Sequence, residues 1–263
     1  MKNARSVGLV GSGEATRLFF AKATALANQL GPVKSSSYRV ASRIVNGLRA
    51  GEPVSDATSL GLCNLVLICV DAGCVHATVA EMVKAELDWK GRSVILCDVP
   101  EDAATLSPLA ALGAHTASIN TFNSEGKMLW IAEGDDVAIR DFKRILLPRA
   151  TPVLQLAPGT KQVFLAGLTL ASLPLYLHVV AVECLRAAGI GVGYGRGIAQ
   201  ALSIESIRAA TKTGRQAIAH RSSEAGWEAS RVQLSALRSF RPDLADVFAN
   251  AMKLVSEFPD APE

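Results

Sequence analysis

The strongest constraint on the fold lies at the start of the chain, where a short apolar run ends in two closely spaced glycines. Residues 7–16 read VGLVGSGEAT. Val7–Val10 predicts a strand, Gly11 permits a tight turn, and a helix is predicted to begin directly afterwards. Gly13 has no side chain, so a phosphate could approach the backbone there and meet the free amides of the first helical turn. We therefore predict a dinucleotide site at Gly11, Ser12, Gly13, Glu14 and Ala15.

This glycine turn departs at one position from the usual G-x-G-x-x-G pattern. Thr16 stands where the third glycine is expected, and this predicts slightly looser packing of the helix on the strand. The same residues could also form a plain strand–helix turn with no ligand. The location of the turn at the start of a β–α–β pattern favours the dinucleotide site.

Apolar runs and helical periodicity alternate along the first part of the chain. Strands are predicted at Val7–Val10, Val33–Arg39, Asn64–Val70, Ser93–Asp98, Thr116–Phe122, Met128–Ala132 and Thr151–Leu156. Helices are predicted at Glu14–Leu30, Ala41–Leu48, Val75–Ala85, Ser107–Leu112 and Asp135–Leu146. Gly31 and Pro32 are expected to stop the first helix, and Ala50–Ser55 to form a loop. Alternating strands and helices predict an α/β fold with a doubly wound parallel sheet, the Rossmann arrangement.

The pattern changes after Pro158, where helical periodicity continues almost without interruption. Helices are predicted at Lys161–Ala188, Ile198–His220, Glu224–Phe240 and Pro242–Phe258, with Gly189–Gly197 as a loop between the first two. The glycines of that loop follow a helix rather than a strand, which disfavours a phosphate site there. We predict a Rossmann domain over residues 1–158 and an all-helical domain over residues 159–263.

The choice between NADP and NAD depends on the residues at the end of the second predicted strand. A carboxylate there would accept hydrogen bonds from the ribose of NAD. The stretch 34–39 reads KSSSYR and contains no carboxylate. Ser36, Ser37 and Arg39 could instead donate to a 2′-phosphate, so NADP is predicted and NAD is disfavoured. These residues could also be an ordinary polar loop.

The apolar run Asn64–Val70 is followed by a second group of candidate cofactor contacts. The loop after such a strand passes over the nicotinamide side of a dinucleotide in this type of fold. Cys69, Val70 and Asp71 are therefore predicted to line the cofactor site. Asp71 could equally be the N-cap of the helix that follows.

A long uncharged segment at Val163–Val182 leaves two interpretations open. Its 20 residues could span a bilayer. A helix buried at the centre of a helical domain, or between two copies of such a domain, would have the same composition. We favour the buried helix and a homodimer formed through the helical domain, with membrane association disfavoured.

Composition excludes several classes of protein. Hydrophobic residues make up 49% of the chain and charged residues 19%, which argues against disorder, and the net charge of +3 argues against a nucleic-acid partner. The five cysteines form no C-x-x-C pair, which favours a reducing, cytoplasmic environment. No metal site is predicted, because no His/Cys/Asp/Glu cluster has metal-ligand spacing.

In several stretches the chain resembles the superfamily of 6-phosphogluconate and β-hydroxyacid dehydrogenases and pyrroline-5-carboxylate reductases. Within it, the chain is similar to short NADP-oxidoreductase-like proteins. The stretches are VGLVGSGEAT at 7–16, NLVLICVD at 64–71, LSPLAALGAHTASINTF at 106–122, WIAEGDDVAIRDF at 130–142 and LRAAGI at 185–190. The resemblance implies a Rossmann domain followed by a compact helical domain that dimerises.

The sequence departs from the resembled proteins at residues that would carry chemistry. The short proteins have a His-Pro pair before Thr121-Phe122, where this chain has residues 118–120 (SIN). They open the long helix with Tyr-His, where this chain has Phe164-Leu165, and the Asn further along is absent from 171–173 (ASL). The hydroxyacid dehydrogenases have a catalytic Lys followed four residues later by Asn. Lys161 could match that Lys, but position 165 is Leu.

Hydride transfer needs a proton donor or acceptor beside the reacting carbon. Lys161 is the leading candidate for this role, because desolvation at the start of an apolar helix would lower its pKa. The position nevertheless favours an ordinary surface lysine at a helix start over a buried acid or base. Asn120 and Thr121 could orient a carbonyl, whereas His178 is expected to be a core residue. We predict an NADP-dependent oxidoreductase acting on a small carbonyl, hydroxyacid or imine substrate. The alternative is a non-catalytic NADP-binding regulatory protein that has lost its acid/base residues.

Overall fold

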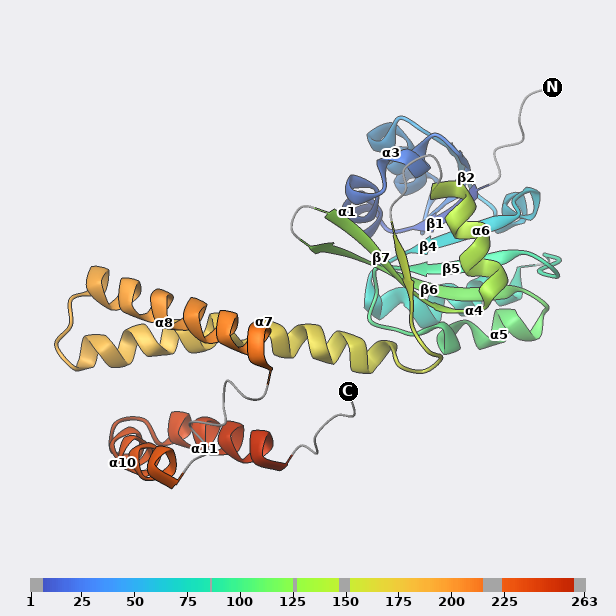
Figure 1. The fold of residues 1–263 in the computed structure, drawn as a ribbon. Helices are drawn as coiled ribbons and strands as arrows, with labels where there is room; N and C mark the ends of the chain where they lie inside the picture. The colour runs from blue at the N-terminus through green and yellow to red at the C-terminus, as the bar shows by residue number, and fades with distance from the viewer. Residues whose placement is uncertain (1–6, 86, 125–126, 147–151, 215–223, 258–263) are drawn as a thin grey trace. The chain divides into compact units, whose positions relative to one another are not determined.

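The computed structural model describes residues 7–85, 87–124, 127–146, 152–214 and 224–257. The chain divides into two compact units, residues 1–170 and residues 171–263. The division falls inside helix α7 (Lys161–Ala187). Figure 1 shows the elements of both units and labels most of them.

An eight-stranded sheet forms the centre of the first unit. Its strands are β1 Val7–Gly11, β2 Leu30–Lys34, β3 Glu52–Val54, β4 Leu65–Cys69, β5 Ser93–Cys97, β6 His115–Ser124, β7 Lys127–Gly134 and β8 Val153–Gln155. They lie in the order β3-β2-β1-β4-β5-β6-β7-β8. Neighbours from β3 to β6 are parallel, β7 is antiparallel to β6, and β8 is parallel to β7. The predicted Rossmann arrangement is confirmed, because the order of β1–β6 is that of a doubly wound dinucleotide fold.

Two predictions about the edge of this sheet are wrong. The predicted loop Ala50–Ser55 contains the short strand β3, which pairs with β2. The predicted helix Glu14–Leu30 is two helices, α1 (Gly13–Lys22) and α2 (Thr24–Ala27), and strand β2 begins at Leu30. Gly31 and Pro32 therefore lie within a strand rather than in a helix stop. Burial explains the difference, since Leu30 and Val33 are completely buried in the sheet core.

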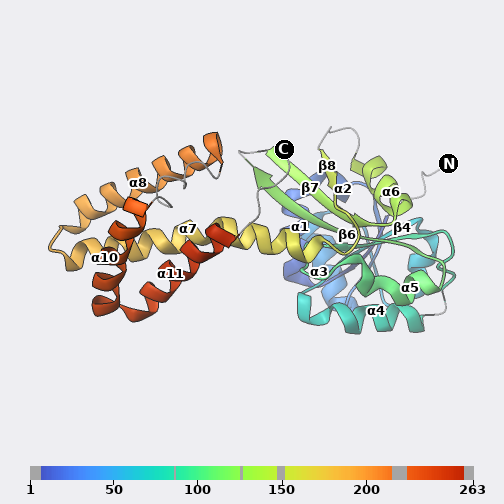
Figure 2. The same cartoon turned by 60° about the horizontal axis from the view of Figure 1, so that its bottom comes forward.

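Helices cover both faces of the sheet (Figures 1 and 2). The remaining helices are α3 Tyr38–Leu48, α4 Val75–Lys84, α5 Ser107–Ala111 and α6 Asp136–Leu146, with 3₁₀ turns η1 Ala57–Leu62, η2 Ala72–Cys74 and η3 Ala103–Leu106. One apolar cluster packs α1, α2 and α6 on one face, and a second packs α4, α5 and η1 on the other. Residues along β4 alternate between these clusters, as expected of a strand covered on both sides.

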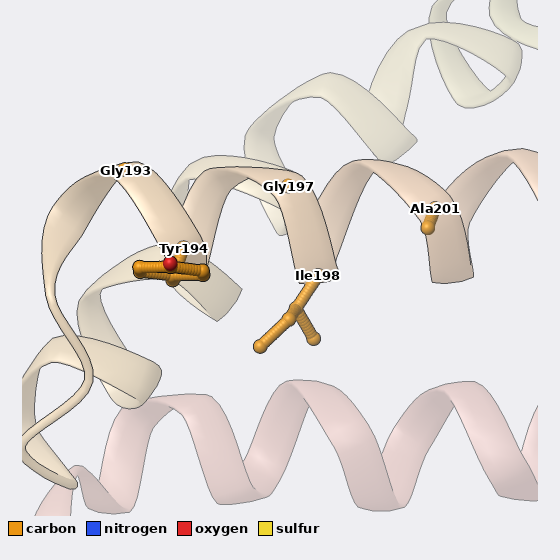
Figure 3. Close-up of a pocket in the computed structure, with 5 residues that line it drawn as sticks. All are labelled: Gly193, Tyr194, Gly197, Ile198 and Ala201. Carbon is orange, nitrogen blue, oxygen red and sulfur yellow. The ribbon is translucent and has the colours of Figure 1, made fainter.

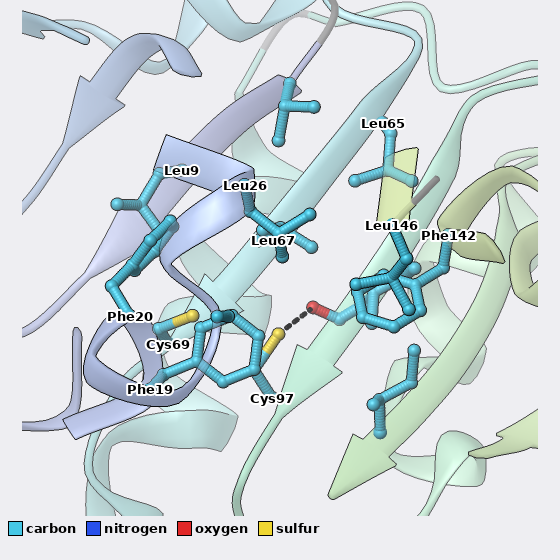
Figure 4. Close-up of a cluster of buried hydrophobic side chains, with 14 of the residues drawn as sticks. Leu9, Phe19, Phe20, Leu26, Leu65, Leu67, Cys69, Cys97, Phe142 and Leu146 are labelled. Atoms are coloured by element: carbon cyan, nitrogen blue, oxygen red, sulfur yellow. Dashed lines mark hydrogen bonds between the residues drawn. The ribbon is translucent and has the colours of Figure 1, made fainter. Parts of the chain in front are cut away.

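Aromatic side chains hold α1 and α6 to the far part of the sheet. The rings of Phe19 and Trp130 lie 5.8 Å apart, and those of Trp130 and Phe142 lie 5.1 Å apart, both edge to face. Figure 4 shows this cluster, with Cys69 and Cys97 among its buried side chains. Helix α1 therefore starts at β1 and reaches β7 through Phe19, and this brings its last turn toward β5 and β6.

The second unit consists of helices over the described ranges. After α7 come α8 Val192–Thr213, α10 Glu224–Phe240 and α11 Pro242–Glu257. The predicted loop Gly189–Gly197 is shorter than expected, because α8 begins at Val192 and takes in three of its glycines. Gly195 lies where α8 packs on α7, and a Cβ there would make an ordinary contact of 3.6 Å with the Cβ of Leu185. The predicted helix ends at His220 and Phe258 lie outside the described residues.

The prediction that Val163–Val182 is a buried helix is wrong for the single chain. Helix α7 is long and apolar enough to cross a membrane by length and composition, and none of its apolar window is buried. The described helices of one chain leave most of its apolar side chains uncovered, including Leu175, Tyr176 and Val179. Helix α8 also carries an apolar hollow of about 510 Å³, lined by Gly193, Tyr194, Gly197, Ile198 and Ala201. Figure 3 shows these residues along the first turns of α8.

Candidate functional site

The glycine turn is held by the end of β4. The backbone N–H of Ser12 donates to the carbonyl of Cys69 at 2.9 Å, and the Thr16 hydroxyl donates to the same carbonyl at 3.2 Å. A Cβ added at Gly11 would lie 2.2 Å from the Thr16 hydroxyl. The predicted looser packing at Thr16 is therefore wrong, because this threonine is buried and fills the space that Gly11 leaves.

The outer side of the same turn is open. A Cβ at Gly13 would meet no atom within 4 Å. Gly13, Glu14 and Ala15 form the first turn of α1, where backbone amides have no acceptor within the helix. The buried hydroxyl of Ser12 has no hydrogen-bond partner in the described part of the chain. Unpaired donors around an open glycine fit a pyrophosphate, which the Glu14 amide could bind while its carboxylate pairs with Arg17 at 2.7 Å.

The corner between β2 and α3 is tied directly to the glycine turn. The buried hydroxyl of Ser35, a residue not singled out from the sequence, donates to the Gly11 carbonyl at 2.6 Å. Ser37 is the N-cap of α3 and accepts from the Val40 amide at 3.3 Å. Ser36 and Arg39 are exposed beside it. The corner thus combines a helix N-terminus with a cation whose side chain makes no ion pair in the described ranges.

Of the three predicted cofactor contacts at the end of β4, two are buried and one is exposed. Cys69 is completely buried, and burial raises the pKa of its thiol well above its ordinary value. Its contribution is the carbonyl that holds the turn, and Val70 is also buried. Asp71 is exposed and precedes η2 without making a side-chain capping bond. Its carboxylate is therefore not used as an N-cap, the other role considered from the sequence.

Lys161 is buried at the start of α7, with 2% of its surface exposed. Its ammonium donates to the carbonyls of Val99, at 2.8 Å, and Glu101, and to the hydroxyl of Ser118. Burial lowers its pKa from 10.5 to about 8, against the opposing effect of the nearby Glu133 and Glu101 carboxylates. The surface lysine that the sequence favoured is therefore wrong, because the structure buries the side chain among the acceptors at the ends of neighbouring elements.

Two residues that were not predicted from the sequence as part of the site interact with Lys161. Ser118 and Glu133 face each other across the antiparallel strands β6 and β7, and both are buried. The Glu133 carboxylate accepts from the backbone amides of Ala103, at 3.3 Å, and Gly159. It therefore joins η3 to the segment just before α7. Ser118 lies inside one predicted strand and Glu133 directly follows the next, but the register of the two strands is needed to bring these residues opposite each other.

Asn120 and Thr121 belong to different clusters because successive residues of a strand point to opposite faces. The Asn120 amide donates to the Val99 carbonyl at 3.3 Å, so Asn120 and Lys161 share one acceptor. Its buried side-chain oxygen has no partner among the described residues. The structure therefore brings Asn120 to Lys161 and turns Thr121 away from it.

Thr121 instead joins Asp98 and Lys22, neither of which was singled out from the sequence. Its amide and hydroxyl donate to the Asp98 carboxylate at 2.6 and 2.9 Å. The Lys22 ammonium donates to the Thr121 hydroxyl at 2.8 Å and to the Asp98 carboxylate at 3.1 Å. Asp98 has φ +51°, a left-handed conformation that is unfavourable for a residue other than glycine.

The glycine turn, the β2–α3 corner, Asp71 and Asp98 lie at the carboxyl ends of the parallel strands β1, β2, β4 and β5. The chain order of the strands reverses between β1 and β4, and ligands of open α/β sheets bind in the crevice outside this point. Gly11 ends β1, the Ser36–Arg39 corner follows β2, and Asp98 follows β5. Strands lie about 4.8 Å apart, so Asp98 is about 10 Å from the end of β1. This spacing suits a ligand with two halves.

Comparison with known proteins agrees with the class of fold that this geometry defines. No protein-family model matches the chain, and no curated protein matches it by sequence. Among solved structures, a pyrroline-5-carboxylate reductase from Coxiella burnetii matches with 14% identity and a TM-score of 0.52, over 97% of this chain and 100% of the other. A reductive aminase from Aspergillus terreus, in complex with NADPH and ethyl levulinate, matches with 13% identity and a TM-score of 0.65, over 95% and 92%.

An imine reductase from Myxococcus stipitatus, in complex with NADP+, also matches the structure of this chain. It has 11% identity and a TM-score of 0.64, over 95% of this chain and 94% of the other. Over nearly its whole length, the chain therefore has the fold of these reductases, a Rossmann unit followed by helices. The fold that the sequence resemblance implied, a Rossmann unit followed by helices, is confirmed.

Proposed function

We propose that this protein is an NADP-dependent oxidoreductase that transfers a hydride to or from a small carbonyl, hydroxyacid or imine compound. The observation that carries the proposal is the open glycine turn at the point where the strand order reverses. The fold is shared with reductases whose structures contain NADPH or NADP+, and this supports the cofactor.

The β2–α3 corner supports NADP over NAD. A 2′-phosphate there would meet the exposed Ser36 and Arg39 and the positive end of α3, whose first turn contains no acidic residue. Ser37 would hold the start of the helix in place. Lys34 already pairs with Glu81 at 2.9 Å, so Arg39 rather than Lys34 would carry the discrimination.

Lys161 and Asn120 are the proposed catalytic pair beside the nicotinamide. The bound cofactor would supply or accept the hydride. A lysine with a pKa near 8 can gain or lose a proton close to neutral pH, which suits a general acid or base. Its three N–H groups now bond to protein acceptors, so a substrate atom would have to displace one of them. Ser118 offers the only side-chain acceptor of the three, and Asn120 would hold the substrate nearby.

A non-catalytic NADP-binding regulator is the second candidate. It is favoured by the complete use of the Lys161 donors and by Ser118 standing in the region where the resembled proteins have His-Pro. A screen of 2-ketoacids and cyclic imines, in which the loss of NADPH absorbance measures turnover, distinguishes the enzyme from the regulator. Turnover that the Lys161→Met variant lacks supports the enzyme, whereas NADPH binding with no turnover of any compound supports the regulator.

A cytoplasmic homodimer is the proposed state of the protein. The support is the exposed apolar surface of the helical unit, where Leu175 is 65% exposed and Val179 59% exposed one turn further along α7. A second copy could cover it by helix packing. Sedimentation without detergent should give a dimer, and Leu175→Glu with Val179→Glu should give a monomer. A requirement for detergent would instead support membrane insertion of α7.

A further inference from the structure

A second polar cluster, just beyond the carboxyl end of β5 and beside the middle of β6, has no role in the function proposed above. Lys22, Asp98 and Thr121 are joined pairwise by hydrogen bonds of 2.6 to 3.1 Å. They come from the end of α1, the end of β5 and the middle of β6. Three separate elements therefore contribute to one compact arrangement.

The backbone of Asp98 shows that this arrangement is maintained at a cost. A residue with a Cβ is strained in the left-handed conformation, and a glycine would relieve the strain. The Asp98 amide donates to the Ile119 carbonyl at 2.8 Å, and its carboxylate accepts from Thr121 and Lys22. These bonds hold the carboxylate where it fixes both donors. Strained residues of this kind are concentrated at ligand sites.

Within the part of the chain that the structure describes, Lys22 retains one donor for a ligand. An ammonium has three N–H groups, and two of them go to Asp98 and Thr121. Its side chain is 42% exposed, unlike the enclosed Lys161. The charges of Lys22 and Asp98 offset each other, so the cluster offers a directed donor with little net charge. Such a site favours a neutral acceptor atom over an anion.

We infer that Lys22, positioned by Asp98 and Thr121, donates a hydrogen bond to a neutral carbonyl oxygen or imine-type nitrogen of the substrate. The inference rests on the proposed function for its place in the reaction. With the phosphates on the glycine turn and one nucleoside over the β2 corner, the other half of a dinucleotide would extend over β4 and β5. Asp98 directly follows β5, so the Lys22 donor lies on the side where the substrate would bind.

The test uses 2-pyrrolidinone, a neutral lactam, as a probe that needs no turnover. The lactam is titrated into the full-length protein with and without NADP+, and the shift of the Thr121 amide resonance is followed by NMR. A small fragment of this kind should bind with a Kd in the millimolar range. Lys22→Met should weaken binding about tenfold, whereas Lys22→Arg should retain most of it. Lys143→Met, in the last turn of α6, is the matched control and should bind as the wild type does.

Each outcome of the titration supports or overturns the inference. Saturable binding that is lost in Lys22→Met and retained in the control supports it. The inference is overturned if the lactam does not bind, or if Lys22→Met binds it as well as the wild type does. Tighter binding of acetate than of the lactam would overturn the preference for a neutral acceptor atom. A parallel NADPH titration of the same variants keeps the proposed function separate. Failure of the wild type to bind NADPH would defeat that function, whereas failure of the lactam alone would defeat only the role of Lys22.

Discussion

Ser118 of β6 lies directly opposite Glu133 of β7, and the two buried side chains form the polar base beneath Lys161. Ser118 accepts a hydrogen bond from the lysine, and Glu133 contributes the largest of the charge effects that favour its protonated form. Removing charge from water remains the dominant effect on the pKa of Lys161. The antiparallel pairing of β6 with β7 therefore matters for the site, because its register brings the two side chains together.

Stability should depend on pH through Lys161. Its pKa of about 8 in the folded protein lies below the 10.5 of an exposed lysine, so between these values the unfolded chain binds more protons. The free energy of unfolding of the wild type, relative to Lys161→Met, should rise from pH 8 to 10.5 by on the order of 3 kcal/mol and be flat below pH 8. Urea unfolding of both proteins across this range measures it. A difference that does not change with pH would mean that Lys161 is not desolvated.

Gly11 and Thr16 should be strongly coupled. Gly11→Ala places a Cβ 2.2 Å from the Thr16 hydroxyl and should destabilise the fold by about 1–3 kcal/mol. Once Thr16→Ala removes that hydroxyl, the nearest remaining contact at 3.5 Å is ordinary. The double variant should therefore lose less stability than the sum of the two single variants. Additive losses in a denaturant-unfolding cycle would contradict the close approach.

Gly13→Asp should abolish NADPH binding and leave the fold intact. The position has open space around it, and an acidic residue in the first helical turn is compatible with the helix dipole. The new carboxylate would repel the phosphates. Gly13→Asn, of similar size and without charge, separates repulsion from bulk and should bind more tightly than Gly13→Asp. Cofactor affinity is measured by NADPH fluorescence and folding by thermal unfolding. Unchanged affinity in Gly13→Asp would place the phosphates elsewhere.

Arg39→Ala should cost NADPH about 1–3 kcal/mol of binding free energy and NADH little, because only NADPH has the 2′-phosphate. Arg140→Ala, which removes an exposed cation from α6, serves as the control and should leave both affinities unchanged. Titrations at fixed ionic strength give the four values, since charge effects are screened by salt. Equal losses for the two cofactors would mean that Arg39 does not contact the phosphate.

Sequence periodicity was sufficient to predict most helices and strands. The wrong predictions fall where contacts between residues far apart in the sequence determine the structure. The glycine turn and the buried strand β4 have signals within ten residues, and both were predicted. The β2 edge was wrong because Gly31 and Pro32 suggest a break, whereas burial of Leu30 and Val33 favours a strand. Exposure of α7 was missed because composition alone does not show what covers a helix.

The candidate site was predicted only in part for the same reason. Lys161 and Asn120 were named separately, and the structure joins them through the Val99 carbonyl. Lys22 and Asp98 are 76 positions apart, and no spacing rule connects them. Thr121 was grouped with Asn120 as its neighbour in sequence, but the alternation of a strand sends the two side chains to different clusters.

NADP should bind at the glycine turn and the β2–α3 corner. The most direct measurement is a titration of the purified wild-type protein with NADPH and with NADH. Calorimetry or fluorescence should give saturable NADPH binding that is at least about tenfold tighter than that of NADH, as expected for a charged contact worth at least about 1.4 kcal/mol. Binding of neither cofactor, or tighter binding of NADH, would contradict the account.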